Sequence, residues 1–303
     1  MIRRPPRSTQ GVSSAASDVY KRQVRIPIMS LKLFYLTTEI KPFANTSHLG
    51  QYSVDVPLAL QTMGHDVRTM IPKYGFVSER KYILREVIRL REIPFEYDGE
   101  DVMTSAKSAF IPKTRVQVYF LENVKWFKGL SNLLYKAKNG RVLPDNDERY
   151  AYFSKAAIAT LPHLFWKPDV LICNDWQSAY VPLIYQQIYD SKEFYGDIKT
   201  VLTVHSVDEY SDFSRAAYDK VGVTLPDNIT GDKVNCYEAA APFADLIVAV
   251  DSPDNNVAEK LLALPGVKAH KKKLVSISID DEETPNFEAT ASALNEELTK
   301  HFV

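Results

Sequence analysis

The sequence of 303 residues has two cysteines, no strong excess of either charge and no long apolar run. Without an apolar stretch of about 20 residues, we expect no membrane-spanning helix, and the net charge of −1 gives no reason to expect nucleic acid as a partner. Cys173 and Cys236 each lie in or beside an apolar segment, so we expect free buried thiols in a reducing cytosol. The composition predicts a soluble, cytoplasmic protein.

The sequence also lacks the motifs that hold phosphate, a metal or an acyl group. It has neither G-x-G-x-x-G nor a P-loop, and the segment EIKPFANTSHLGQ (39–51) has one glycine. A phosphate-binding loop needs backbone N–H groups that approach closely, which glycines permit. The six histidines are scattered and no serine lies in a nucleophile elbow. We therefore expect no metal site and no cofactor.

Residues 1–28 differ in composition from the rest of the chain. The stretch MIRRPPRSTQGVSSAASDVYKRQ (1–23) is rich in Arg, Ser and Pro, and it lacks the apolar core and cleavage signature of a secretory signal. We interpret it as translated sequencing-adapter read-through, with a transit peptide or a disordered leader as the biological alternative. The predicted organisation is this leader, 1–28, followed by one domain, 29–303.

Apolar runs alternate with amphipathic segments from Lys32 onward. Strands are expected at 32–38, 67–71, 116–121, 170–173, 200–205 and 246–250, and helices at 52–63, 147–164, 176–189, 232–241 and 287–302. Residues 82–120 break the rhythm and predict a small inserted β element, built either of paired strands or of a helix and a strand. The alternation predicts a single Rossmann-like, doubly wound α/β domain with a parallel sheet. Ligands of such sheets bind beyond the carboxyl ends of the strands, here at 39–50, 174–177, 205–209 and 251–254.

Five segments resemble bacterial glycogen and starch synthases, in the same order along the chain. The first, TTEIKPFANTSHLGQYSVDVPLALQTMGHDVRTMIPKY (37–74), follows the family pattern that begins SE-x-x-PF-x-KTGGLAD. The others are DNDERYAYFSKAA (145–157), VLICNDWQSAYVPLIY (170–185), KTVLTVHS (199–206) and FADLIVAVDSP (243–253). The resemblance implies the amino-terminal half of the two-domain GT-B fold.

That resemblance implies transfer of glucose from ADP-glucose to the non-reducing end of an α-1,4-glucan, with retention. Residues that match the polar or aromatic positions of the family's acceptor cleft are candidates for substrate binding: Glu39, Asn146, Arg149, Asp175 and Trp176. Asp145 and His205 are the candidate catalytic residues. Structural alternatives stay open, since Asp145 can cap the following helix, Arg149 can pair with Asp145 or Glu148, Trp176 can be core packing and His205 can be a satisfied structural histidine.

The loop that contacts the sugar nucleotide in the family is degenerate here. Asn45 replaces the Lys of KTGGL, Ser47 and His48 replace its glycines, and Gln51 replaces the Asp that follows. Lysine is a point charge for phosphate and glycine allows close backbone approach, so we expect ADP-glucose to bind only weakly. In the family's HDWH segment Asn174 and Gln177 replace the two histidines, and amides cannot titrate.

The segment KLVSISID (273–280) resembles the strand that leads into the family's second, nucleotide-binding domain, and the residues after it are too few for such a domain. We therefore expect a short single-domain relative, whose Leu294, Leu298 and Phe302 lie at helical spacing and pack back on the domain. Three functions stay open. They are a glycosyltransferase completed by a partner that supplies the second domain, a non-catalytic glucan-binding or regulatory module, and an unrelated scaffold.

Overall fold

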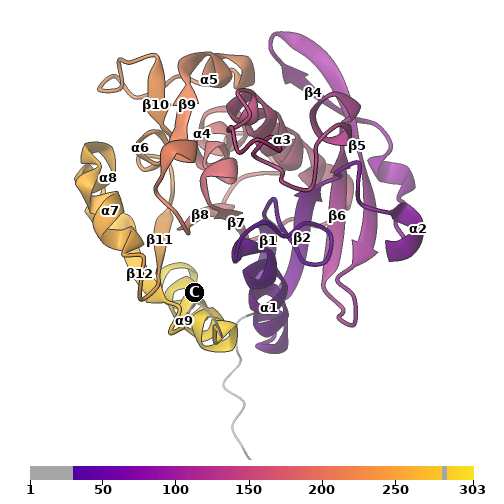
Figure 1. Ribbon diagram of the computed structural model, residues 1–303, viewed down its shortest axis with the longest axis horizontal. Helices are drawn as coiled ribbons and strands as arrows, with labels where there is room; N and C mark the ends of the chain where they lie inside the picture. Colours follow the sequence, from indigo (N-terminus) through magenta and orange to yellow (C-terminus); the bar gives the residue numbers. More distant parts are fainter. Residues whose placement is uncertain (1–29, 282–284) are drawn as a thin grey trace, which may run out of the picture.

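The computed structural model describes residues 30–281 and 285–303; the expectations for residues 1–28 lie outside this part. A ten-stranded sheet forms the centre of the domain, in the order β12-β11-β8-β7-β1-β2-β6-β5-β3, with β4 paired to β5 (Figure 1). Its parallel strands are β1 (Lys32–Leu36), β2 (Asp66–Pro72), β6 (Gln117–Glu122), β7 (Val170–Asn174), β8 (Lys199–Val204), β11 (Leu246–Asp251) and β12 (Leu274–Ser278). The predicted α/β class with a doubly wound parallel sheet is confirmed.

Successive strands of the chain are added first on one side of β1 and then on its other side. From β1 the strands β2 and β6 follow on one side, whereas β7, β8, β11 and β12 follow on the other. β1 pairs in parallel with both β2 and β7. The carboxyl ends of β1 and β7 therefore form the topological switch point, where open α/β sheets bind ligands.

The inserted element consists of paired strands, which settles the alternative left open by the sequence. It contains α2 (Glu79–Tyr82), β3 (Arg85–Glu86), β4 (Ile93–Tyr97) and β5 (Glu100–Phe110). β4 and β5 form a hairpin at Asp98–Gly99, where both residues have positive φ, as a tight Asp-Gly turn requires. Because β5 pairs antiparallel with β6, the element extends the main sheet and makes it mixed.

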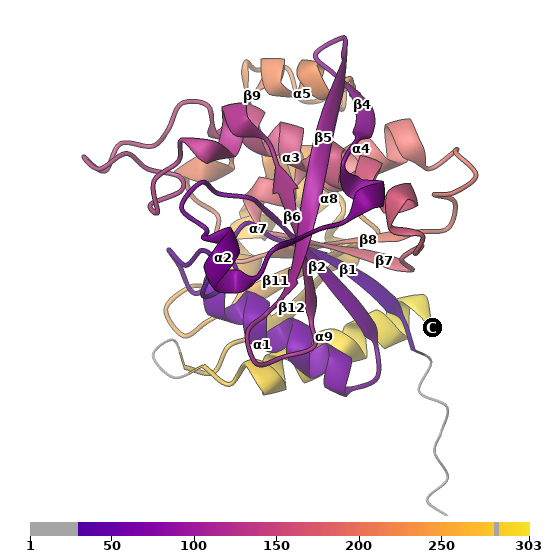
Figure 2. The same cartoon turned by 90° about the vertical axis from the view of Figure 1, so that its right-hand side faces the viewer.

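Helices cover the two faces of the sheet (Figures 1 and 2). On one face α1 (Leu49–Thr62) and α9 (Phe287–Phe302) share a core with the strands. The larger core on the other face includes α3 (Asn146–Thr160), α4 (Tyr180–Ile184), α5 (Arg215–Val221), α6 (Cys236–Ala240), α7 (Val257–Ala263) and α8 (Pro265–Ala269). Cys173 and Cys236 are buried free thiols, as expected, and burial raises the pKa of both.

Several helix predictions needed correction. The helix expected at 232–241 begins only at Cys236, because β10 (Lys233–Asn235) pairs with β9 (Asp212–Ser214) and the Asn235 side chain caps α6. The helix expected at 176–189 is α4 flanked by a 3₁₀ turn, Trp176–Ser178, and a π turn, Tyr185–Tyr189. The sequence analysis missed α5, α7 and α8, which are short. No helix in residues 30–281 and 285–303 has the length and apolar character to cross a membrane.

The C-terminal helix packs back on the domain, as its apolar spacing predicts. Leu294 and Leu298 of α9 are fully buried, and Phe302 is partly buried against the same core. His65, which lies between α1 and β2, hydrogen bonds through Nε2 to Asn295 Oδ1 at 2.6 Å and through Nδ1 accepts the Leu31 N–H at 3.1 Å. This buried imidazole joins α9 to the start of β1.

Candidate active site

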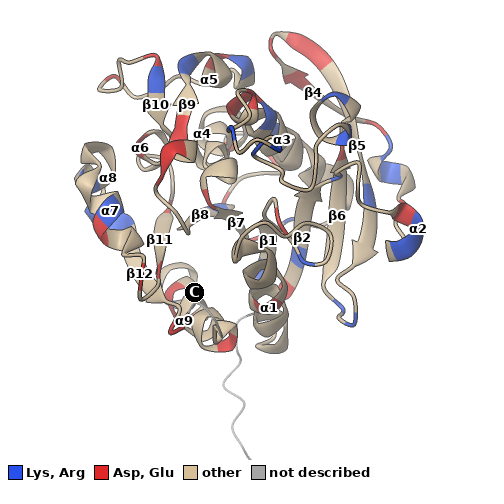
Figure 3. Cartoon of the chain, in the orientation of Figure 1, with Lys and Arg blue, Asp and Glu red and all other residues tan. Residues whose placement is uncertain are grey.

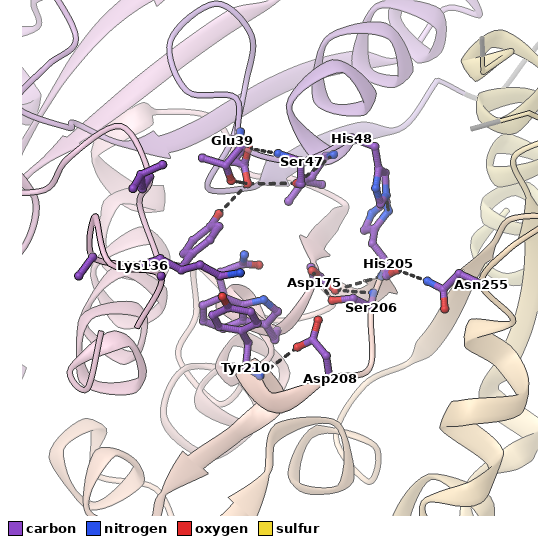
Figure 4. A pocket seen from close by; sticks show the side chains of 18 of the residues that line it. Glu39, Ser47, His48, Lys136, Asp175, His205, Ser206, Asp208, Tyr210 and Asn255 are labelled. Carbon is purple, nitrogen blue, oxygen red and sulfur yellow. Dashed lines mark hydrogen bonds between the residues drawn. The ribbon is translucent and has the colours of Figure 1, made fainter. Parts of the chain in front are cut away.

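A pocket of about 510 Å³ lies beyond the carboxyl ends of β1, β7 and β8. It is lined by loops that follow these strands, by the segment 133–140 and by Asn255. Figure 4 shows Glu39, His48, Asp175, His205 and Tyr210 arranged around this cavity. Three of the segments expected to bind ligands, 39–50, 174–177 and 205–209, contribute to the lining, and the volume is in the range of small-molecule sites.

The carboxylate of Glu39 is used to hold the loop that follows β1. It accepts hydrogen bonds from the Thr46 N–H, from the Thr46 hydroxyl at 2.7 Å, and from the Ser47 N–H and hydroxyl at 3.1 Å each. A further bond comes from the Tyr135 hydroxyl at 3.0 Å. Glu39 is fully buried, so it positions this loop, and the N–H groups of Thr46 and Ser47 are already engaged.

Asp175 occupies the turn after β7 with a φ of 59°, a backbone conformation that is costly for a residue with a side chain and often found at functional sites. Its carboxylate accepts the N–H groups of His205 at 3.0 Å and Ser206 at 3.1 Å, and the Tyr237 hydroxyl at 2.9 Å. Burial raises the Asp175 pKa to about 6, although these hydrogen bonds act to lower it. Asp175 thus joins the ends of β7 and β8 to α6.

His205 follows β8 and lies against a second imidazole. Its Nδ1 is 3.3 Å from His48 Nε2, and its ring meets the Tyr52 ring edge to face at 4.5 Å. Burial, and secondarily the nearby His48, lower the His205 pKa well below its usual value, so the ring is neutral at pH 7. Its Nε2 is buried with no hydrogen-bond partner in the described part of the chain.

Aromatic rings form one wall of the pocket. Trp176 is 3% exposed, and the Tyr135 and Tyr150 rings meet it edge to face. The Tyr210 ring stacks on Trp176 with centroids 5.4 Å apart and an angle of 14°. Trp176 is covered, whereas the Tyr210 ring is half-buried and has the Lys136 Nζ 5.4 Å from its centroid.

The structure places several of the sequence candidates away from this pocket. Asp145 forms an ion pair with Arg149, whose Nη1 donates to the Trp126 carbonyl at 2.8 Å. Asn146 donates to the Tyr135 carbonyl at 3.0 Å and lines a neighbouring pocket of about 430 Å³. The pairing of Arg149 with Asp145 is the structural alternative named above, although the Asp145 side chain makes no cap bond.

Some residues of the degenerate loop line the pocket and others lie outside its lining. Ser47 and His48 line the pocket, whereas Asn45 is exposed and outside the lining. Gln51 points along α1 and donates to Asp55 at 2.8 Å. The Asn174 side chain links β7 to its two neighbours. Its Nδ2 donates to the Leu36 carbonyl of β1 at 2.8 Å, and its Oδ1 accepts the Thr203 hydroxyl of β8 at 2.7 Å.

Sequence reasoning missed part of the lining. Tyr135 and Lys136 belong to none of the five motifs and come from a long irregular segment. Asp208 lies in the predicted segment 205–209 after β8 and Tyr210 directly follows that segment, but no pattern distinguished either residue. Among residues 30–281 and 285–303, no group of three or more His, Cys, Asp or Glu side chains could hold a metal ion.

The fold and the pocket define a Rossmann-like α/β domain with a polar and aromatic site at its switch point. Residues 32–257 match the family described as "Starch synthase catalytic domain". The chain is 34% identical over 224 residues to a glycogen synthase of Chlorobium limicola, which covers 72% of this chain and 45% of that protein. A glycogen synthase of Pelodictyon phaeoclathratiforme is 32% identical over 224 residues, with the same coverage. The chain therefore belongs to the starch synthase catalytic domain family, as its motifs implied.

A solved structure supports the fold. The catalytic domain of starch synthase IV from Arabidopsis thaliana, bound to ADP and acarbose, matches with a TM-score of 0.68 at 24% identity. The match covers 82% of this chain and 51% of that chain. At this identity the likeness shows the fold alone. The chain spans about half the length of the relatives it matches.

Proposed function

We propose that the 510 Å³ pocket binds the end of an α-1,4-glucan, as the acceptor side of glucose transfer from ADP-glucose in cytoplasmic glycogen synthesis. The Tyr210 ring stacked on Trp176 carries this proposal. Pyranose rings present apolar C–H faces that pack on aromatic rings, while their hydroxyls need hydrogen-bonding groups around that contact. Asp175, Asp208 and the neutral His205 line the same pocket.

The residues of this pocket are poorly suited to bind the donor, ADP-glucose. The N–H groups of Thr46 and Ser47 donate to Glu39 and so are not free to bind a phosphate. The pocket lining contains three carboxylates, Glu39, Asp175 and Asp208, against the two ammonium groups of Lys136 and Lys138. This balance disfavours a diphosphate, and we propose that efficient transfer depends on groups from a nucleotide-binding half or partner.

The pocket residues have limited scope for acid or base catalysis. Retaining transfer requires that donor and acceptor are held together and that the oxocarbenium-like transition state is stabilised. His205 is neutral at pH 7 and its Nε2 is buried, and the candidate Asp145 pairs with Arg149 outside the lining. The engaged donor loop favours a second candidate function, a non-catalytic glucan-binding or regulatory module of glycogen metabolism.

Replacement of the aromatic surface tests the proposed binding. In calorimetric titrations with a maltooligosaccharide, Tyr210→Ala is expected to weaken the affinity about tenfold, because ring stacking of this kind contributes about 1 kcal/mol or more. Phe165→Ala is the control, since that ring is 84% exposed elsewhere on the surface. Equal affinity of Tyr210→Ala and the wild type would contradict the site.

Incorporation of radiolabelled glucose from ADP-glucose into glycogen separates the two candidate functions. Activity of the chain only in the presence of a nucleotide-binding partner supports the transferase. Glucan binding without incorporation under any such condition supports the non-catalytic module.

A further inference from the structure

Another pocket lies at the outer edge of the sheet, apart from the two pockets described above. Its volume is about 310 Å³, and it is lined by Lys81, Tyr82, Ile83, Arg85 and the segment 108–114. These residues belong to α2, β3, the end of β5 and the turn after it, and none of them lines the 510 Å³ pocket. We call it the β3–β5 pocket.

Two large apolar side chains at this pocket are exposed. Ile83 is 66% exposed and Phe110, the last residue of β5, is 57% exposed. Ile83 also ends α2 in the left-handed conformation, with φ 54° and ψ 49°. Glycine or asparagine suits this position, and a β-branched residue there is an outlier. Ile83 is therefore an exposed isoleucine in a strained backbone conformation, and little of its side chain is buried by the rest of the domain.

The cations of the pocket have no counter-ions in the described part of the chain. Lys81, Arg85 and Lys113 form no ion pair among those residues. The acidic residues close to Lys81 and Arg85 in sequence already have partners, since Glu79 pairs with Lys73 at 3.4 Å and Lys107 at 2.8 Å. Glu86 likewise pairs with Arg91 at 2.9 Å. Figure 3 shows Lys and Arg on α2 at this edge.

We propose that the β3–β5 pocket docks an acidic segment of a partner protein that inserts one large apolar side chain between Ile83 and Phe110. Carboxylates on either side of that anchor are complementary to Lys81, Arg85 and Lys113. β3 is the last strand of the sheet, and the edge of a sheet is where an extended peptide adds. The pocket accommodates a side chain, which favours a peptide over a lipid surface.

The docked segment would rest on an element that contacts the loop after β1. The Tyr82 hydroxyl donates to the Pro42 carbonyl at 3.2 Å, and the rings of Tyr82 and Phe43 meet edge to face at 4.8 Å. Pro42 and Phe43 precede the loop residues Asn45–His48, with Ala44 between them. The proposal does not depend on glucan binding and can fail or succeed independently of it.

The test uses a fluorescently labelled, glutamate-rich peptide with a central leucine, and a matched peptide with alanine in place of the leucine. Fluorescence anisotropy gives the affinity for the wild-type chain and three variants. Lys81→Glu/Lys113→Glu reverses the charge of the pocket. Lys271→Glu/Lys272→Glu is the matched control, because these exposed lysines lie on a distant turn outside the pocket.

The expected result is saturable binding of the leucine peptide, weakened about tenfold or more by the pocket reversal and less than about twofold by the control reversal. Ile83→Gly is expected to weaken binding while its thermal midpoint stays equal or rises, because glycine adopts positive φ without strain. This variant separates loss of the anchor from loss of the fold.

Five outcomes would overturn the proposal. They are absence of saturable binding to the wild type, equal weakening by both reversals, and equal affinity for the alanine peptide. The fourth is tighter binding to phosphatidylserine vesicles than to the peptide. A concentration-dependent dimer abolished by Lys81→Glu/Lys113→Glu would also contradict it, because the occupant would then be a second copy of this chain.

Discussion

The packing of α9 on α1 and the sheet allows the loss of stability in an α9 variant to be predicted. Leu294 and Leu298 are both fully buried on this helix, and replacement of a buried leucine by alanine costs about 2–5 kcal/mol through lost burial and the cavity left behind. With an m-value of about 3 kcal/mol per molar urea, Leu294→Ala is expected to lower the unfolding midpoint by about 1 M. Deletion of residues 286–303 removes both side chains and should lower it further.

Circular dichroism during urea unfolding is the assay, with Ser292→Ala as the control because Ser292 is exposed on the same helix. The expected order of stability is wild type equal to Ser292→Ala, then Leu294→Ala, then the deletion. An unchanged midpoint in Leu294→Ala would show that α9 does not contribute to the domain core. A changed m-value would show that the substitution also alters the compactness of the native or unfolded state.

Three further predictions concern the site. Glu39→Gln removes the charge that accepts five hydrogen bonds and is expected to destabilise the domain by about 2 kcal/mol or more, measured by urea unfolding. For Asp175 the folded pKa of about 6 lies above the ordinary value of 3.8 for an aspartate. The folded state therefore binds the proton more tightly, and stability relative to Asp175→Asn should fall by roughly 2–4 kcal/mol as pH rises from about 4 through about 6; a pH-independent difference would contradict the burial of this carboxylate. Phe287→Ala removes the ring that packs on Tyr52 at 5.5 Å, and Tyr52 in turn packs on His205, so the His205 resonances should shift in NMR spectra even though Phe287 is on α9.

The parallel strands and three of the loops that line the pocket could be predicted, because these strands are buried apolar runs that are readable without knowledge of tertiary contacts. The order of the strands in the sheet, and with it the switch point at the ends of β1 and β7, is known only from the structure. The amphipathic spacing of Leu294, Leu298 and Phe302 predicted α9 without knowledge of tertiary contacts. The short helices α5, α7 and α8 were not predicted, because segments of five to seven residues contain too few turns for a helical periodicity to be recognised.

The partners of the candidate side chains could not be predicted from the sequence. Glu39 matched a family position, but only the folded loop shows that its carboxylate accepts the Thr46 and Ser47 N–H groups. Tyr210 lies on the aromatic wall because the chain after β8 turns back over Trp176, and no local pattern encodes that contact. Long-range packing therefore determines which matched residues face the pocket.

The central claim is that these residues bind a glucan and not a nucleotide sugar with useful affinity. Parallel calorimetric titrations of the 303-residue chain with maltoheptaose and with ADP-glucose test it most directly. Each missing charge-assisted hydrogen bond removes about 1.5–3 kcal/mol, so two missing contacts weaken donor binding by about two orders of magnitude or more. We expect a measurable heat of saturable binding for maltoheptaose and no ADP-glucose binding tighter than millimolar. Micromolar affinity for ADP-glucose, or no binding of maltoheptaose, would contradict the account.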